Sequence, residues 1–375
     1  MSVTVFDEHH VDQSVTIERV TSAAYKVPTD APESDGTLQW ESTTLVVVCV
    51  AAGDCEGFGY TYAPAAAARF VDEKLSDVVR ERNAFEVERC WHAMVHAVRN
   101  AGYPGIAFAA ISAIDTALWD LKARLLGLPL YQLWGAVRDE VPLYGSGGFT
   151  SYDDGRLQEQ LGAWAAEGFH RVKMKVGREP ENDSRRVALA RQAIGDRVEL
   201  FVDANGAYGR KQALQLAQLF AEQSNVVWFE EPRPSDDLDG LRLLRDRGPG
   251  GMDIAAGEYG YTPWYFRRML ASHAVDCLQA DVTRCGGFTG FFKVAALCEA
   301  FLIPLSAHCA PYLHTHIACC VHPLRHVEYF HDHVRIADML FDGHNPPIQG
   351  HLSPDPSRSG HGLTLKTSDA EKFAV

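Results

Sequence analysis

The sequence is most informative at Val226-Val227-Trp228-Phe229-Glu230-Glu231-Pro232, where four apolar residues end abruptly in two carboxylates and a proline. A short apolar run bounded by a breaker is typical of a buried strand in a parallel sheet. Pro232 prevents the strand from continuing. The pattern therefore predicts that Glu230 lies at the carboxyl end of a strand.

The same construction recurs on both sides of this stretch. An apolar run at residues 198–202 ends at Asp203, and another at residues 253–257 ends at Glu258. Consecutive acids are separated by about 28 residues, the length of one strand, one helix and two short loops. Three acids are therefore expected to close three successive strands of one sheet.

Further polar residues follow short apolar runs at a similar interval: Lys175 before the three acids, and Asp281, His308 and Glu328 after them. Acids often begin helices as N-caps, which would explain any one of these positions but not a whole series that shares a phase. A parallel sheet closed into a barrel brings all its carboxyl ends to one face, where active sites of this architecture lie. The sequence therefore predicts an α/β barrel with a charged mouth.

The chain of 375 residues is longer than a plain barrel of roughly 250 residues. Residues 15–22, 43–50 and 57–60 predict a small antiparallel sheet, and residues 63–134 have a helical pattern. The polar residues 25–36, with two prolines, are predicted to be a long functional loop. We therefore divide the chain into an α+β domain at 1–135, a barrel domain at 136–344 and a C-terminal segment at 345–375, expected to pack back on the first domain.

Composition excludes several classes of partner. The net charge of −14 argues against nucleic acid and anionic membrane surfaces, which require a basic patch. No stretch approaches the roughly 18 apolar residues of a membrane span, and Met1–His10 lacks the pattern of a signal peptide, so we expect a cytoplasmic protein. The nine cysteines form no Cys-x-x-Cys pair and are interpreted as reduced core residues. We expect a small-molecule substrate and a homo-oligomer.

The residue types at the predicted mouth suit a metal-dependent enzyme. Asp203, Glu230 and Glu258 are hard oxygen ligands suited to Mg²⁺, with Mn²⁺ as the alternative. Without a cation, three converging carboxylates would repel one another. These three residues are therefore the predicted metal ligands.

Two further groups are candidates for proton transfer. Lys173 and Lys175 point to the same side of a strand, where two ammonium groups disfavour each other's charge, so one lysine can act as a base. The alternative is a pair of surface lysines on an edge strand. Asp281 and His308 end neighbouring strands, which allows a hydrogen bond that fixes the imidazole tautomer. A lone histidine is more often structural; five others have no support from the strand register, namely His314, His316, His322, His331 and His333.

Together these motifs resemble the enolase superfamily and, within it, the mandelate racemase group. The resemblance covers nearly the whole chain. It rests on the helix at 113–126 with Gly127-Leu128-Pro129, Lys173-Met174-Lys175, Val202-Asp203-Ala204-Asn205, Glu230-Glu231-Pro232, Gly257-Glu258, Asp281 with Gly286-Gly287-Phe288-Thr289-Gly290, His308 and Glu328. The muconate lactonizing group differs, since it carries a lysine where this chain has Asp281.

The resemblance implies a modified (β/α)7β TIM barrel with an N-terminal α+β capping domain. It implies Mg²⁺ held by the three acids, with Lys175 as a base on one face of the substrate and His308, oriented by Asp281, as an acid or base on the other. Lys173 would depress the pKa of Lys175. The substrate-binding residues would be Glu328, Asn205, Lys26 and Asp35, the last two on a cap loop that closes over the substrate.

Most proteins with this constellation resemble acid-sugar dehydratases, which remove the α-proton of an aldonate or aldarate and then its β-hydroxyl to give a 2-keto-3-deoxy acid. The polar cap loop favours a hydroxylated substrate. Racemisation or 2-epimerisation of an α-hydroxy acid is the alternative. A metal-dependent hydrolase of the amidohydrolase type would need His-x-His at the end of the first barrel strand, where this chain has Tyr144-Gly145-Ser146. A non-catalytic binding barrel is disfavoured by the complete set of acid, base and ligand residues.

Overall fold

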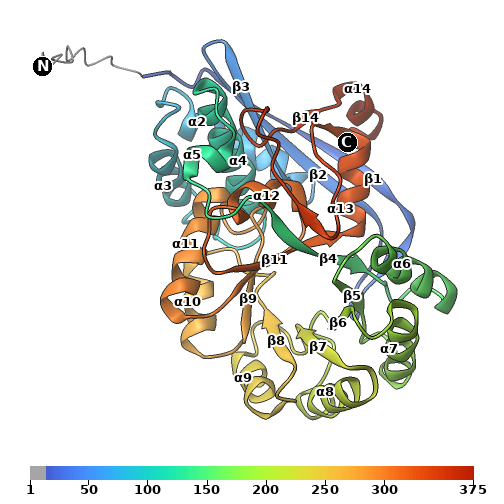
Figure 1. Cartoon of the computed structure of the whole chain (residues 1–375). Coiled ribbons are helices and arrows are strands. Elements are labelled where there is room, and N and C mark those ends of the chain that lie inside the picture. The colour runs from blue at the N-terminus through green and yellow to red at the C-terminus, as the bar shows by residue number, and fades with distance from the viewer. Residues whose placement is uncertain (1–13) are drawn as a thin grey trace, which may run out of the picture.

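The computed structural model describes residues 14–375, so the predicted absence of a signal peptide at Met1–His10 lies outside the described residues. Eight parallel strands form a closed barrel, because the last strand pairs with the first (Figure 1). This confirms the predicted barrel. Its strands are β4 (Val141–Gly147), β5 (Arg171–Lys175), β6 (Glu199–Asp203), β7 (Val226–Glu230), β8 (Asp253–Ala256), β9 (Cys277–Ala280), β10 (Leu305–Ala307) and β11 (Leu324–Phe330).

A helix follows each barrel strand and covers the outside of the sheet. Several helices begin at residues that satisfy their free backbone N–H groups: the side chains of Asp153, Asp237 and Thr262 each accept such a bond. The helices are α6 (Asp154–Ala166), α7 (Pro180–Ile194), α8 (Arg210–Ser224), α9 (Leu238–Arg247), α10 (Pro263–Ala271), α11 (Gly287–Phe301), α12 (Pro311–Ala318) and α13 (His331–Leu340).

The inside of the barrel is filled by large side chains. Tyr144, Phe201 and Trp228 belong to one buried cluster, and the rings of Phe201 and Trp228 stack with centroids 5.1 Å apart. Side chains alternate along a strand, so Asp203 and Glu230, two residues further on, point to the same interior side. This buried aromatic cluster therefore lies inside the barrel directly below the polar residues of the mouth.

The N-terminal domain is an antiparallel sheet covered by helices. Its strands are β1 (Arg19–Ser34), β2 (Gln39–Ala52) and β3 (Cys55–Tyr62), in that order. Helix α4 (Ile106–Leu125) lies so close to β3 that a Cβ atom on Gly59 would stand 2.0 Å from Thr116 Oγ1. Gly59 is therefore required for this packing. The other helices are α1 (Ala66–Phe70), the π-helix η1 (Val71–Leu75), α2 (Ser76–Val79), α3 (Val87–Ala97) and α5 (Leu130–Trp134).

The prediction of a long loop at residues 25–36 is wrong. This stretch is the end of β1 and pairs with β2, and only the turn at 35–38 separates the two strands. Proline is tolerated here because β1 is an edge strand, and the register shifts between Pro28 and Glu33. The cap therefore presents a two-stranded hairpin where the sequence predicted a loop.

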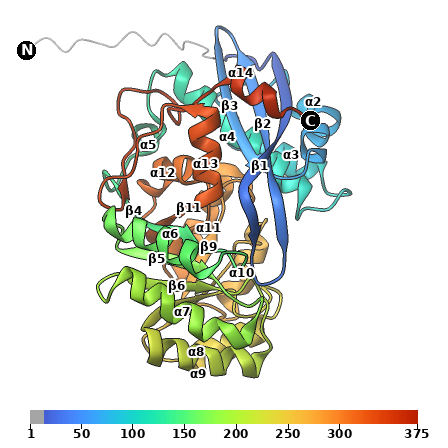
Figure 2. The ribbon, with the colours of Figure 1, turned by 90° about the vertical axis from the view of Figure 1, so that its right-hand side faces the viewer.

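The C-terminal segment contacts both the barrel and the cap. Strand β13 (His351–Leu352) pairs with β4, and β12 (Phe341–Asp342) pairs with β14 (Thr364–Leu365). His361 Nε2 lies 2.7 Å from the backbone oxygen of Phe58, and the Val375 N–H donates to the backbone oxygen of Ala24 over 3.0 Å. Figure 2 shows α14 (Thr367–Ala370) beside the cap sheet, and the short helix η2 (Glu371–Phe373) follows it. The three-part division of the chain stays a prediction.

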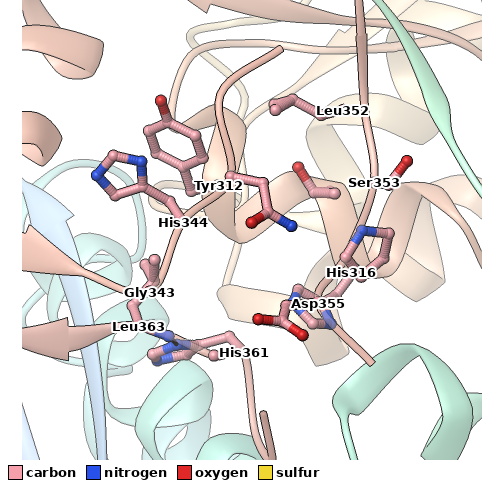
Figure 3. A pocket seen from close by; sticks show the side chains of 13 residues that line it. Tyr312, His316, Gly343, His344, Leu352, Ser353, Asp355, His361 and Leu363 are labelled. Carbon is pink, nitrogen blue, oxygen red and sulfur yellow. Dashed lines mark hydrogen bonds between the residues drawn. The ribbon is translucent and has the colours of Figure 1, made fainter. Parts of the chain in front are cut away.

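A small polar cavity lies between α12 and the C-terminal segment (Figure 3). Its volume of about 20 Å³ matches a single water molecule. Nδ1 of His316 and Nδ1 of His344 are buried there without a hydrogen-bond partner among residues 14–375. Burial lowers the pKa of His316 to about 3, so its imidazole is neutral. This cavity is too small for a substrate.

The cysteines and the search for membrane-spanning helices bear on two further interpretations of the sequence. All nine cysteines are free, and six of them are buried. Within the described part of the chain, no helix combines the length and the apolar character needed to cross a membrane.

Candidate active site

The predicted mouth residues lie together at the carboxyl ends of the barrel strands. Lys175 is level with Asp203 on the neighbouring strand, and Asp203 is level with Glu230 on the next. Glu258 follows β8, while Asp281 and His308 directly follow β9 and β10. All of them are buried, as are Lys173 on β5 and Glu328 on β11. The structure therefore brings these eight predicted residues to one place.

Asp203, Glu230 and Glu258 form a compact trio, here called the carboxylate trio. One oxygen of each lies within 4.8 Å of the others. The backbone N–H of Asn205 donates to Asp203 Oδ1 over 2.9 Å, and Trp228 Nε1 donates to Glu230 Oε2 over 2.9 Å. Glu258 Oε2 is buried and has no aligned hydrogen-bond donor among the described residues, although His308 Nε2 lies 3.3 Å away. A set of converging, oriented carboxylates with a buried free oxygen fits a hard divalent cation.

Both lysines of β5 contact acids of the site. Lys173 Nζ contacts Glu230 and lies 2.8 Å from Glu328 Oε1, and Lys175 Nζ contacts Asp203. Burial is the largest single effect on the pKa of Lys175 and lowers it, but Asp203, Glu258 and Glu230 together raise it by more, so the pKa lies above its ordinary value. Lys173 lowers the pKa of Lys175, in the expected direction, without outweighing Asp203. A cation bound to Asp203 would oppose that attraction.

His308 is held by a carboxylate on either side. Its Nδ1 lies 2.9 Å from Asp281 Oδ2, and its Nε2 lies 3.3 Å from Glu258 Oε2. Burial raises the pKa of Asp281, but the hydrogen bond with His308 and the positive charges of His308 and Arg284 together lower it below its usual range. Asp281 is therefore ionised and accepts the Nδ1 proton, which leaves Nε2 to face the carboxylate trio.

The carboxylate of Glu328 is fully engaged by the protein. Its Oε1 accepts from Ser146 Oγ over 2.6 Å, and its Oε2 accepts from the backbone N–H of Cys309 over 2.9 Å. Cys309 and Ala310 both have positive φ, at 53° and 39°. Strained backbone at non-glycine residues clusters at functional sites. In the structure, Glu328 binds Ser146 and the backbone of Cys309. Its contact with substrate stays a prediction.

A cavity of about 460 Å³ opens above these residues, between the cap and the barrel, and is here called the mouth cavity. Ligand pockets are typically of this size. The barrel contributes Lys175, Asn205, Glu258, Tyr259, Arg284, His308, Cys309, Phe330 and His333; the cap contributes Asp35, Leu38, Trp40, Ser42, Thr43, Thr44, Tyr62, Ala63 and Pro64.

The two predicted residues of the cap differ in position. Lys26 is exposed, pairs with Thr44 across β1 and β2, and does not line the mouth cavity. Asp35 lines it, but its Oδ1 accepts from the backbone N–H groups of Thr37 and Leu38 over 2.6 and 2.7 Å. Asp35 therefore shapes the hairpin turn.

Sequence reasoning missed several groups that line the mouth cavity. His333 has no support from the strand register, yet it lines the mouth cavity, and its ring stacks on that of Tyr62 with centroids 3.5 Å apart. The backbone N–H of Ala310 donates to His333 Nδ1 over 3.3 Å, so the proton of the neutral ring is on Nε2. Burial lowers the pKa of His333 to about 3. Its position just after the last barrel strand was the signal that could have identified it.

Comparisons with known proteins agree with this geometry. A profile described as "Mandelate racemase / muconate lactonizing enzyme, N-terminal domain" matches residues 19–135, and one described as "Enolase C-terminal domain-like" matches residues 156–370. The 3,6-anhydro-alpha-L-galactonate cycloisomerase of Streptomyces coelicolor (strain ATCC BAA-471 / A3(2) / M145) is 33% identical over 96% of this chain and 99% of that protein.

Two solved structures extend the comparison. A mandelate racemase/muconate lactonizing enzyme-like protein from Rubrobacter xylanophilus is 56% identical, with a TM-score of 0.94 over 96% of this chain and 100% of its own. L-talarate/galactarate dehydratase from Salmonella typhimurium LT2, liganded with Mg and L-lyxarohydroxamate, is 27% identical, with a TM-score of 0.89 over 100% of this chain and 96% of its own. These matches exclude the amidohydrolase alternative, and the chain belongs to the mandelate racemase group of the enolase superfamily, a family of enzymes.

Proposed function

We propose that this enzyme dehydrates an acid sugar, an aldonate or aldarate, to a 2-keto-3-deoxy acid with Mg²⁺ as its cofactor. The observation that carries this proposal is that two groups able to transfer protons flank the carboxylate trio: Lys175 contacts Asp203 on one side, and His308 lies beside Glu258 on the other. A substrate carboxylate held at the trio would therefore have one of these groups on each side of its α-carbon.

Asp203, Glu230 and Glu258 would hold the metal. Bound there, Mg²⁺ supplies positive charge that stabilises the negative charge gained by the substrate carboxylate when its α-proton leaves. The dehydratase from Salmonella typhimurium is liganded with Mg, and the oxygen donors of this chain have the hardness that Mg²⁺ prefers.

The protein residues would then move two protons. Lys175 Nζ, in its neutral form, takes the proton from C2, and the electrons of the C2–H bond pass into the carboxylate to give an enediolate. Those electrons next form a C2–C3 double bond while the C3–O bond breaks, and His308, protonated on both ring nitrogens, gives its Nε2 proton to the departing hydroxyl. Water and an enol result, and protonation of the enol at C3 gives the 2-keto-3-deoxy acid. Asp281 accepts the Nδ1 proton of His308 and so keeps the imidazole in the orientation that this transfer requires.

Isomerisation is the second candidate, and two observations favour it. The same pair of flanking groups can remove a proton from one face of C2 and return it to the other, which is racemisation or 2-epimerisation. In addition, one relative is a cycloisomerase, whose name also denotes a reaction without net loss of water. Dehydration and isomerisation diverge only after the α-proton has been removed.

A screen of aldonates and aldarates with Mg²⁺ tests the proposal. We expect one group of stereochemically related acids to release a 2-keto acid, detected with a carbonyl reagent, and nuclear magnetic resonance in D₂O to show the matching 2-keto-3-deoxy product. An enzyme that exchanges the α-proton and yields an epimer or a cyclic isomer, without keto acid, would replace dehydration by isomerisation. Absence of both exchange and product across the library would remove acid sugars as substrates.

A further inference from the structure

A second, larger cavity adjoins the mouth cavity and takes no part in the proposed reaction. This cavity, which we call the aromatic vestibule, has a volume of about 650 Å³. Five aromatic side chains line it: Tyr103, Tyr259, Tyr261, Trp264 and Tyr265. Tyr103 comes from the cap, before α4, and the others come from the loop after β8 and the start of α10. The vestibule therefore lies at the junction of the two domains.

The vestibule and the mouth cavity share a wall. Asn205 and Tyr259 line both cavities, and Asn205 Nδ2 donates to Tyr259 Oη over 3.2 Å. The Tyr259 ring also lies 6.0 Å from the guanidinium of Arg284, which lines the mouth cavity. Asn205 and Tyr259 therefore form a shared boundary between the two cavities.

Helix capping and ring packing help to position the aromatic rings of the vestibule. The Thr262 side chain accepts from the backbone N–H of Tyr265 and Pro263 occupies the first turn, so α10 begins at a defined point. The ring centroids of Trp264 and Tyr103 are 5.2 Å apart, and Tyr103 packs edge-on against Phe108. Trp264 is nevertheless 46% exposed. Such a large, ordered and accessible aromatic surface is typical of a binding site.

Polar groups accompany the rings. Ser235, Asp236 and Arg268 line the same cavity, and Arg268 lies one helical turn after Trp264, on the same side of α10. Asn205 is 92% buried, since its exposed fraction is 8%, and its Oδ1 accepts no hydrogen bond within residues 14–375. Aromatic faces bind the C–H faces of a sugar ring, and charged and amide groups around them bind its hydroxyls. The combination fits a carbohydrate ring better than a purely apolar ligand.

We propose that the aromatic vestibule is a second sugar-binding subsite, which holds a glycosyl ring attached to the acid sugar in the mouth cavity. The inference rests on the proposed function for the acid-sugar part alone. It implies that aldonates carrying a glycosyl substituent bind better than the corresponding free aldonates. Stacking on an aromatic ring is a modest contribution, so we expect a gain of roughly 3- to 10-fold in affinity, equivalent to about 0.7–1.4 kcal/mol.

The first test measures binding without chemistry. Saturation-transfer nuclear magnetic resonance with methyl α-D-glucopyranoside and methyl β-D-galactopyranoside is applied to the Mg²⁺-loaded wild-type protein, to Trp264→Ala and to Phe301→Ala. Phe301 is a matched control, because it is an exposed aromatic residue on α11 that does not line the vestibule. We expect transfer in the wild type and in Phe301→Ala, and its loss in Trp264→Ala. No transfer from the wild type would overturn the inference.

The second test compares gluconate with maltobionate and melibionate, which are gluconates substituted by a glycosyl ring at O4 and at O6. Calorimetry should show that at least one disaccharide acid binds roughly 3- to 10-fold tighter than gluconate, and that Trp264→Ala removes this difference. Equal affinities for all three acids would contradict the subsite. If methyl glycosides bind while no acid sugar reacts, the proposed function fails and the vestibule stands; if acid sugars react and no glycoside binds, the reverse holds.

A second copy of the chain is the other occupant that an exposed aromatic surface admits. Sedimentation velocity of the wild type and Trp264→Ala decides this point, and we expect the same assembly for both. Dissociation of the assembly by Trp264→Ala would assign the vestibule to a subunit interface and overturn the sugar subsite.

Discussion

The barrel mouth and the cap hairpin both line the mouth cavity, yet they hold their polar groups in different ways. At the mouth, the candidate residues lie near strand ends and have charged neighbours from other strands, as His308 does between Asp281 after the adjoining β9 and Glu258 after β8, one strand further on. In the hairpin, Asp35 accepts hydrogen bonds from its own turn, and Lys26 is exposed and does not line the cavity. The charged groups of the mouth are therefore placed to act on a substrate, whereas the hairpin residues maintain the shape of the cavity wall.

The largest effect is expected at the carboxylate trio. Glu230→Gln should abolish turnover and weaken Mg²⁺ binding, because a neutral amide replaces a ligand, while Lys173 keeps its contact with Glu328 and the fold persists. Calorimetry with Mg²⁺ and circular dichroism measure these two outcomes. The control is Glu222→Gln on the exposed side of α8, which should change neither. Unchanged Mg²⁺ affinity in Glu230→Gln would remove this residue from the site.

Substitutions of the two proton-transfer residues should impair different steps of the reaction. General acid–base catalysis contributes about 10²–10⁴-fold per group, so Lys175→Ala and His308→Asn should each reduce turnover by that order. On a true substrate in D₂O, we expect His308→Asn to exchange the α-proton without releasing keto acid, and Lys175→Ala to do neither. His322→Asn, at an exposed position, is the control. If each variant exchanged only one stereoisomer and the wild type released no keto acid, the enzyme would be an epimerase.

A moderate effect is expected from the hairpin turn. Asp35→Ala removes the acceptor of two backbone hydrogen bonds, which loosens the cap wall of the cavity. We expect the ranking of kcat/KM among acid sugars to change, with KM rising more than kcat falls. Lys26→Ala on the same hairpin should leave that ranking intact, since Lys26 does not line the cavity. A larger effect of Lys26→Ala than of Asp35→Ala would contradict these assignments.

The smallest effect concerns stability rather than activity. Glu33 of the hairpin is fully buried, and burial, together with the nearby Asp332, raises its pKa to about 8. Because the folded pKa lies above the unfolded value, this group's stabilisation is complete below about pH 4.5 and is lost as the pH rises through about 8. The melting temperature should therefore fall between pH 5 and pH 9, by less in Glu33→Gln than in the wild type or in the exposed control Glu41→Gln. Parallel pH profiles for all three proteins would contradict this account.

The barrel could be predicted because its signal is local. Each apolar run that ends in Asp203, Glu230 or Glu258 specifies a strand by itself, and the constant spacing places the strand ends on one face. The cap hairpin could not be predicted in the same way, since two prolines and many polar residues favour a loop locally. Pairing with β2 and a register shift overrode that preference.

The sequence by itself determined the order of the strands, the side to which their terminal residues point and the chemical type of the carboxylate trio, because side-chain alternation and strand–helix spacing are properties of the chain alone. Only the tertiary structure decided which groups touch: Lys175 with Asp203 rather than with solvent, His333 with Tyr62, and Asn205 with Tyr259 between two cavities. These contacts join segments far apart in the sequence, and they depend on how the cap packs on the barrel. No periodicity within either domain encodes that packing.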